Sequence, residues 1–312
     1  MPEVRSFSIA PLDIPADSSL AKELPRLKRH LKSESARLQE WHREGADGRE
    51  VCAARSAVID TLLATLFNWT LDTFEPKKRE RKLTMTLVAI GGYGRSELNP
   101  HSDIDFMLLH SGTTPSVTRI FNHELIEKLT GPGGLIYTLY DLGMKVGYSV
   151  RNIQDAVNVA NDDMQTKTSL IESRLISGDA GLFEQFQKRV EVKCVRSHID
   201  DYLQMRITDQ DARRVKFGNS ALLQAPNIKN GCGGLRDYQN LLWMTHFKYG
   251  TRTLAELEAQ EMIRPNNRAQ LEKGYGFLLR VRNELHYQTK RPSDDLHKAL
   301  QPKVAWQLGY KD

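Results

Sequence analysis

The chain has 312 residues, a net charge of +5 and a pI of about 9.0, and 40% of its residues are hydrophobic. This composition is typical of a globular protein with a substantial core, and no apolar run is long enough to span a bilayer. Three cysteines far apart in the sequence argue against a disulfide framework or a zinc site, and the N-terminus lacks the pattern of a signal peptide. We therefore expect a cytoplasmic protein with no membrane role. The mild positive charge suits a partner that carries phosphates.

The first half of the chain predicts two helices followed by a small mixed α/β region. Leucines recur at helical spacing near the N-terminus, and two later runs are apolar, rich in β-branched residues and bounded by turn signals. The predicted elements, in chain order, are helices over 19–45 and 50–74, strands over 84–90 and 103–110, a helix over 117–129 and a strand over 136–149.

From residue 153 onward the sequence predicts only helices. The one interruption is the loop APNIKNGCGG, which contains one proline, two asparagines and three glycines. The later helices are predicted over 235–249, 253–260 and 266–289. The predicted organisation is an N-terminal helical segment over 1–79, an α/β core over 80–152 and a helical domain over 153–312.

Two aspartates follow a glycine pair in the stretch GGYGRSELNPHSDID at 91–105. Asp103 and Asp105, at i and i+2 on a predicted strand, would present two carboxylates on one face. Two like charges repel unless a cation lies between them, and Mg²⁺ prefers carboxylate oxygens together with substrate phosphates. Gly91 and Gly92 end the preceding strand, where the backbone can approach a ligand closely and offer N–H groups to phosphate. The pattern predicts a magnesium and nucleotide site.

The combination of an apolar strand, a glycine pair, a short loop and DxD resembles the nucleotidyltransferase fold of the DNA polymerase β superfamily. P-loop and dinucleotide-binding fingerprints are absent. Five longer blocks narrow the resemblance to the bacterial PII uridylyltransferases: GGYGRSELNPHSDIDFMLL, YDLGMKVGYSVRN, TSLIESRLISGD, PNIKNGCGGLRDYQNLLW and FLLRVRNELHYQTKRPSDDL. The resemblance implies an α+β fold, with a small mixed-sheet polymerase β-like core, N-terminal helices and a C-terminal helical domain.

The resemblance also implies an activity: transfer of UMP from UTP to a tyrosine of the nitrogen regulatory protein PII, with release of pyrophosphate. Asp103 and Asp105 match the metal-binding pair of a two-metal, Mg²⁺-dependent mechanism. Gly91 and Gly92 match the residues that approach the triphosphate. A third carboxylate on a neighbouring strand is usual in the superfamily. Asp141 is the candidate for this third metal ligand and catalytic group.

Several other residues are candidates for the site, and most of them have both a functional and a structural interpretation. Ser102 and Arg95 could contact phosphate, although Ser102 could equally cap a turn. Lys229 and Arg236 flank a glycine-rich loop and suit the phosphates or the nucleotide, although a structural loop remains an alternative. Glu172 is the alternative to Asp141, with helix pairing or packing as its other interpretation.

Three alternatives to uridylyl transfer remain open. A protein adenylyltransferase of the same fold, such as the glutamine synthetase adenylyltransferase, has a similar glycine-rich block. A nucleotide-binding regulatory module with weak catalysis is a second alternative, against which the intact DxD argues. Nucleic-acid extension is disfavoured because aromatic residues are 8% of the chain and do not interleave with a basic stripe. None of the nine histidines is followed by aspartate, so the HD hydrolase signature of full-length family members is absent from these residues.

Overall fold

The computed structural model describes residues 7–75, 83–112, 123–197 and 199–310. The chain divides into two compact units, each assembled from separate segments. Unit 1 consists of Met1–Leu38, Ala53–Leu98 and Ser102–Glu191. Unit 2 consists of Gln39–Cys52, Asn99–His101 and Val192–Asp312.

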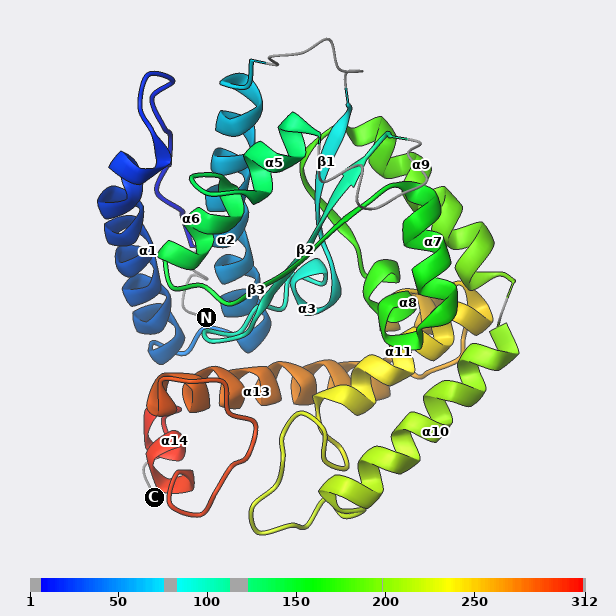
Figure 1. Cartoon of the computed structure of the whole chain (residues 1–312). Coiled ribbons are helices and arrows are strands. Elements are labelled where there is room, and N and C mark those ends of the chain that lie inside the picture. Colours follow the sequence, from blue (N-terminus) through cyan, green and yellow to red (C-terminus); the bar gives the residue numbers. More distant parts are fainter. Residues whose placement is uncertain (1–6, 76–82, 113–122, 198, 311–312) are drawn as a thin grey trace. The chain divides into compact units, whose positions relative to one another are not determined.

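Unit 1 contains the sheet and the helices that cover it (Figure 1). Its first two helices each have one end counted with unit 2. The elements, in chain order, are α1 (Leu20–Arg43), α2 (Gly48–Asp72), β1 (Met85–Ala89), α3 (Gly91–Gly94), β2 (Ile104–His110), α5 (Glu124–Thr130), α6 (Leu135–Asp141), β3 (Val146–Arg151), α7 (Ile153–Asp162), α8 (Met164–Ile171), β4 (Arg174–Gly178) and α9 (Ala180–Val190).

The sheet has four strands in the order β3-β2-β1-β4. β1 is antiparallel to both β2 and β4, whereas β2 and β3 are parallel. Ala89 pairs with Phe106, so the end of β1 lies beside the start of β2. A parallel pair needs a crossover connection, and α5 and α6 lie within the connection from β2 to β3.

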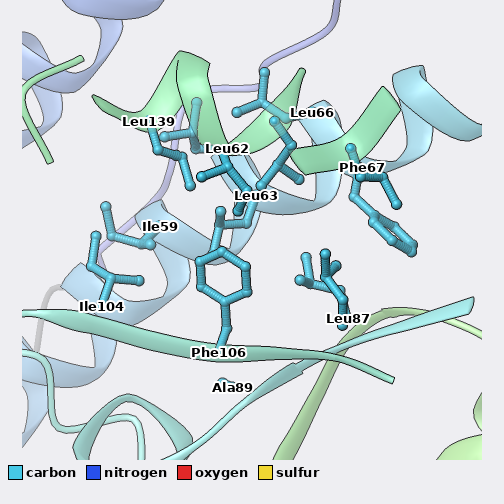
Figure 2. Packing of buried hydrophobic residues seen from close by; sticks show 14 of the residues in the cluster. Ile59, Leu62, Leu63, Leu66, Phe67, Leu87, Ala89, Ile104, Phe106 and Leu139 are labelled. Atoms are coloured by element: carbon cyan, nitrogen blue, oxygen red, sulfur yellow. The ribbon is translucent and has the colours of Figure 1, made fainter. Parts of the chain in front are cut away.

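The main core of unit 1 lies between one face of the sheet and the helices α2, α5 and α6 (Figures 1 and 2). Strand residues that alternate along β1 and β2 face this core. Figure 2 shows how they meet α2 and α6, with labels on Ile59, Leu62, Leu63, Leu66, Phe67, Leu87, Ala89, Ile104, Phe106 and Leu139. Burial of this many aliphatic side chains is the main force that assembles the unit.

The other face of the sheet is covered by α7, α8 and α9 (Figure 1). α9 packs on β1, β2 and β4, and α7 packs on β3. All five residues of β1 are buried, as expected of a strand that is covered on both faces. The start of β2 is different. Asp105, on this face, is exposed, while its neighbours Ile104 and Phe106 are buried.

Unit 2 is helical. Its elements are α10 (Ile199–Phe217), α11 (Leu235–Tyr249), α12 (Leu254–Ala259), α13 (Pro265–Thr289) and α14 (Gln301–Gln307), and the π-helix η1 (Glu191–Val195) contains the boundary with unit 1. α13 packs against α11, α12 and α14, and α10 packs against α11. Two small apolar clusters hold these helices together, one around Leu285 and Val304 and one around Leu279 and Leu235.

The structure confirms the predicted α+β fold, including its mixed sheet, and corrects two of the predicted elements. The strand predicted over 136–149 is wrong in its first part, because Leu135–Asp141 form the helix α6 and only Val146–Arg151 form a strand. Within α6, Leu135, Ile136, Thr138 and Leu139 are buried, while Tyr137, Tyr140 and Asp141 are exposed. This spacing is helical, and packing against the core favours the helix over the β propensity of the run.

The expectation of helices alone after residue 153 is also wrong. Arg174–Gly178 form β4, which pairs with β1 and completes the sheet. Of the helix predicted over 117–129, residues 117–122 lie outside the described residues, and the rest falls in α5. The division of the chain at 79/80 and at 152/153 stays a prediction.

Candidate functional site

The glycine turn and the aspartate pair are neighbours in unit 1. Because β1 and β2 are antiparallel, the turn after β1 begins beside the first residues of β2. The backbone N–H of Ile90 donates to the carbonyl oxygen of Asp105 at 3.0 Å, and Gly91 follows directly. Asp103 and Asp105 are both exposed, and the residue between them is buried. Asp105 therefore lies on β2 and Asp103 lies directly before this strand, next to the glycine turn.

The glycines of this turn meet different requirements. Gly91 has a φ of +59°, a left-handed conformation that side chains disfavour. At Gly94 an added Cβ would overlap the carbonyl oxygen of Glu172, so this glycine allows α3 to approach the end of α8. At Gly92 an added Cβ would meet only the Arg95 side chain, at 3.7 Å. At Gly91 an added Cβ would likewise have one neighbour among the described residues, Ser169 Cβ at 3.8 Å, so a ligand could approach the backbone of both glycines closely.

The neighbouring strand makes room for one of the carboxylates. Gly147 on β3 pairs with Asp105, and a Cβ added at Gly147 would overlap the Asp105 Oδ1 atom. Carboxylate oxygens are the ligands that Mg²⁺ prefers, and one or two of them are enough when substrate phosphates complete the shell. The pair Asp103 and Asp105 therefore fits a magnesium ion that is bound together with a nucleotide.

Ser102 directly precedes the pair. Its Oγ atom is buried, and among the described residues it has no hydrogen-bond partner. A buried hydroxyl without a partner costs free energy, so a ligand or a water that bonds to it would be favoured. This environment suits the predicted contact to phosphate better than the alternative role as a turn cap, since a cap would show a bond to a backbone N–H.

Arg95 is held by two carboxylates. Its Nη1 lies 2.6 Å from Glu172 Oε2, and its Nε lies 2.7 Å from Glu97 Oε2. The Glu172 side chain is 7% exposed and the Arg95 side chain 20%, so the pair is largely shielded from water. The predicted contact of Arg95 with phosphate stays a prediction, but Arg95 is not on an exposed loop. Glu172 caps the C-terminal end of α8. Its ion pair with Arg95 agrees with the pairing that was the alternative to a catalytic role.

A second ionic cluster fixes the centre of the turn. The Tyr93 hydroxyl donates to Asp60 Oδ1 at 2.6 Å, and Arg174 donates to both oxygens of Asp60, at 2.7 and 3.0 Å. The sequence did not indicate these three residues as a group, because they come from α3, α2 and β4. The sequence signals were that Tyr93 belongs to the block GGYGRSELNPHSDIDFMLL and Arg174 to the block TSLIESRLISGD.

Asp141 does not lie on a strand beside the pair, and this corrects the reason for choosing it. It is the last residue of α6 and is exposed. On β3, the residues that share a face with Asp105 are Gly147 and Ser149, which carry no carboxylate. Across the described parts of the chain, no three Asp, Glu, His or Cys side chains gather as a candidate metal site. The third-ligand role of Asp141 therefore has no geometric support.

Lys229 and Arg236 belong to unit 2. The Lys229 Nζ lies 3.9 Å from Asp294 Oδ2, and the Arg236 guanidinium lies over the Trp243 ring, 5.0 Å from its centre. The backbone N–H of Arg236 donates to the Lys229 carbonyl at 2.8 Å, which closes the glycine-rich loop between them. The nucleotide-binding role of both residues stays a prediction.

Asp237, next to Arg236, accepts hydrogen bonds from Arg213 and from the backbone N–H of Gly233. Its carboxylate therefore ties α10 to the loop before α11.

The chain resembles proteins of known families. A family model described as GlnD PII-uridylyltransferase matches residues 201–312. A bifunctional uridylyltransferase/uridylyl-removing enzyme from Rhodospirillum rubrum is 32% identical over 270 residues, and one from Caulobacter vibrioides is 30% identical over the same length. Each of these alignments covers 86% of this chain and 28% of the relative, so the chain spans little more than a quarter of their length.

The relatives are of the kind that the five sequence blocks resembled, and the family model spans the last two of these blocks. Within the described parts of the chain, no helix combines the length and the apolar character that crossing a membrane requires. The chain therefore contains a region that is similar to the GlnD PII-uridylyltransferases.

Proposed function

We propose that this region transfers UMP from UTP to a tyrosine of a PII protein, with release of pyrophosphate. The observation that carries the proposal is the placement of Asp103 and Asp105 beside the glycine turn, in a chain similar to uridylyltransferases. In the reaction, the tyrosine oxygen forms a bond to the α-phosphorus of UTP, and the bond from that phosphorus to the pyrophosphate oxygen breaks.

Asp103 and Asp105 would hold Mg²⁺ against the triphosphate. The bound ion would supply neutralisation of the charge that develops on the phosphate oxygens. The N–H groups of the turn at Gly91 and Gly92 would orient the triphosphate, and the Ser102 hydroxyl would donate to one of its oxygens. The contribution of these residues is mainly position and charge, which is where catalysis of phosphoryl transfer chiefly lies.

A labelling experiment tests the proposal. The chain is incubated with Mg²⁺ and labelled UTP or ATP, with a PII protein, with its variant in which the acceptor tyrosine is phenylalanine, or with no acceptor. We expect label on PII from UTP alone, and none on the phenylalanine variant. Label from ATP would indicate the adenylyltransferase, and binding of nucleotide without transfer would indicate the regulatory module.

The aspartate pair provides the matched chemical test. Asp103→Asn and Asp105→Asn keep the size of each side chain but remove the charge that binds the metal. We expect each to lower the transfer rate about 100-fold or more, because the charge stabilisation is lost. Calorimetry with UTP should show that Mg²⁺ no longer strengthens binding. Equal Mg²⁺-dependent binding in the double variant would contradict the metal assignment.

A further inference from the structure

The cluster of Tyr93, Asp60 and Arg174 holds the glycine turn by side chain and by backbone. Tyr93 is 1% exposed and is the central residue of the GGYG helix α3. Arg174 donates to the Tyr93 carbonyl oxygen at 3.3 Å in addition to its two bonds to Asp60, and its guanidinium lies 5.5 Å from the centre of the Tyr93 ring. Both ends of Tyr93 are therefore bonded to groups from α2 and β4.

The chemistry of the cluster favours a fixed geometry. A carboxylate that receives a planar guanidinium through two parallel bonds accepts it in one orientation. Burial, and to a lesser extent the Asp60 charge, raises the pKa of Tyr93 well above its ordinary value, so the phenol stays a donor at any working pH. The side chains of Asp60 and Arg174 are 25% and 30% exposed, and pairs with this much solvent contribute little to global stability. The main effect of the cluster is to orient Tyr93.

The residues beside Tyr93 need such a constraint. Gly91 has a left-handed backbone. The carbonyl oxygens of Gly91 and Gly92 accept bonds from the N–H groups of Arg95 and Glu97, so the turn is closed by its own backbone. A turn of this kind loses conformational freedom when it binds a ligand, unless neighbouring structure has already fixed it.

We propose that Asp60 and Arg174 are positioning residues for the nucleotide: they lock Tyr93, and through it they hold the backbone of Gly91 and Gly92 in the conformation that receives the triphosphate. The proposal rests on the proposed function for the identity of the ligand. The cluster itself is independent of it, since its bonds join only residues of this chain.

The test uses three variants of the whole chain. Asp60→Asn keeps an acceptor for the Tyr93 hydroxyl but removes the charge opposite Arg174. Tyr93→Phe removes only the hydroxyl, and Arg174→Lys keeps the charge but loses the paired bonds. We expect Asp60→Asn to raise the Kd and the KM for UTP about 10- to 100-fold, the cost typical of removing a group that orients a ligand-binding residue. Tyr93→Phe and Arg174→Lys should have smaller effects of the same sign.

Glu34→Gln is the matched control. Glu34 on α1 is a buried carboxylate of unit 1 that accepts two bonds from Arg37, at 2.8 and 2.9 Å. This variant weakens a similar ion pair that does not involve α3. It should lower Tm while it leaves the Kd for UTP unchanged.

Amide hydrogen exchange distinguishes a positioning role of the cluster from a general contribution to stability. In the absence of nucleotide, Asp60→Asn should speed exchange at residues 91–95, and Glu34→Gln should not. Unchanged exchange there in Asp60→Asn, or a Kd that follows Tm equally in both variants, would overturn the positioning role. A wild-type chain that binds neither UTP nor ATP would overturn the proposed function, and the exchange result would then decide the positioning of the turn alone.

Discussion

At the scale of single residues, the missing side chain of Gly147 determines where the Asp105 carboxylate can lie. A methyl group at Gly147 would overlap Asp105 Oδ1, so Gly147→Ala must turn that carboxylate away from its present position. We expect Mg²⁺-dependent binding of UTP to weaken roughly 10- to 100-fold, because small displacements of a ligand-orienting group have effects of this size. Calorimetry measures the change.

Ser149→Ala is the control for this variant. Ser149 lies two residues further along β3, on the same face, and pairs with Met107 rather than with an aspartate. Its removal should leave UTP binding unchanged. Since Gly147 is exposed, Gly147→Ala should also keep Tm close to that of the wild type. Normal UTP binding by Gly147→Ala would show that Asp105 does not act at the position the structure gives it.

Site residues that follow one another along the chain could be predicted from the sequence. The relation of Asp103 to Asp105, and of both to the glycine pair, depends on strand alternation and on a single turn. Asp60 and Arg174 could not be found in this way, because three elements must fold together before they meet Tyr93. Asp141 was misplaced because its role depended on a strand that is a helix.

At the scale of elements, α13 offers a matched pair of glycines. An alanine at Gly274 would meet nothing within 4 Å, whereas a Cβ at Gly276 would lie 2.7 Å from Asp47 Oδ2. We expect Gly274→Ala to stabilise the fold by about 0.5–1 kcal/mol, the gain in helix propensity. Gly276→Ala should gain less than Gly274→Ala, because the exposed Asp47 carboxylate, which accepts from the Arg49 N–H, has to shift. Chemical denaturation of both variants checks the difference.

The errors in element type have local physical reasons. The run LIYTLYD combines β-branched and aromatic residues, which favour a strand, with buried positions spaced as in a helix. The segment RLISG has only five residues and lies between helices, and its strand state depends on pairing with β1. Long helices such as α2 and α13 were predicted correctly, because periodicity over many residues outweighs local ambiguity.

At the scale of the whole molecule, stability should fall in acid in two stages. Burial lowers the pKa of His110 below 6.5, opposed by the charge of Asp155 and assisted by that of His123. Asp294 has a lowered pKa: burial raises it, but Arg282 and Lys229 together outweigh that effect. Glu284 has a lowered pKa as well, since bonds from His42, Gln288 and Arg43 outweigh burial.

The sign is the same in both stages. When the folded pKa is the lower one, the unfolded chain binds a proton that the folded chain refuses, so stability is lost as the pH falls. The His110 stage begins near pH 6.5, and the carboxylate stage begins as the pH falls through the ordinary pKa range of Asp and Glu. Each proton contributes a slope of up to about 1.4 kcal/mol per pH unit.

His110→Asn isolates the first stage. Asparagine keeps an acceptor for the Gly112 N–H, which now bonds to His110 Nδ1, but it cannot take up a proton. Urea denaturation between about pH 7.5 and 5.5 should show a smaller loss of stability in the variant than in the wild type. The same slope in both proteins would remove His110 from the explanation.

The two units are each assembled from segments that are distant in the sequence, and the sequence pattern does not predict this division. The C-terminal end of α1, the N-terminal end of α2 and the segment Asn99–His101 are all counted with unit 2. Asn99 is held there by Asn283, which accepts its amide at 2.6 Å, and by Arg282. Such bonds join positions that are distant in sequence, so the hydrophobic pattern of the sequence does not predict them.

The position of β4 has a consequence for how the protein is made. β4 covers one edge of β1, yet the ribosome produces it only after α5 to α8 have emerged. Until then a nascent chain carries the apolar segment MTLVA with one edge unpaired, and such an edge can recruit strands from other chains. Any expressed fragment that stops before residue 174 would retain this hazard permanently. The free edge of β1 is therefore protected from pairing with other chains only after the chain has been synthesised beyond Gly178.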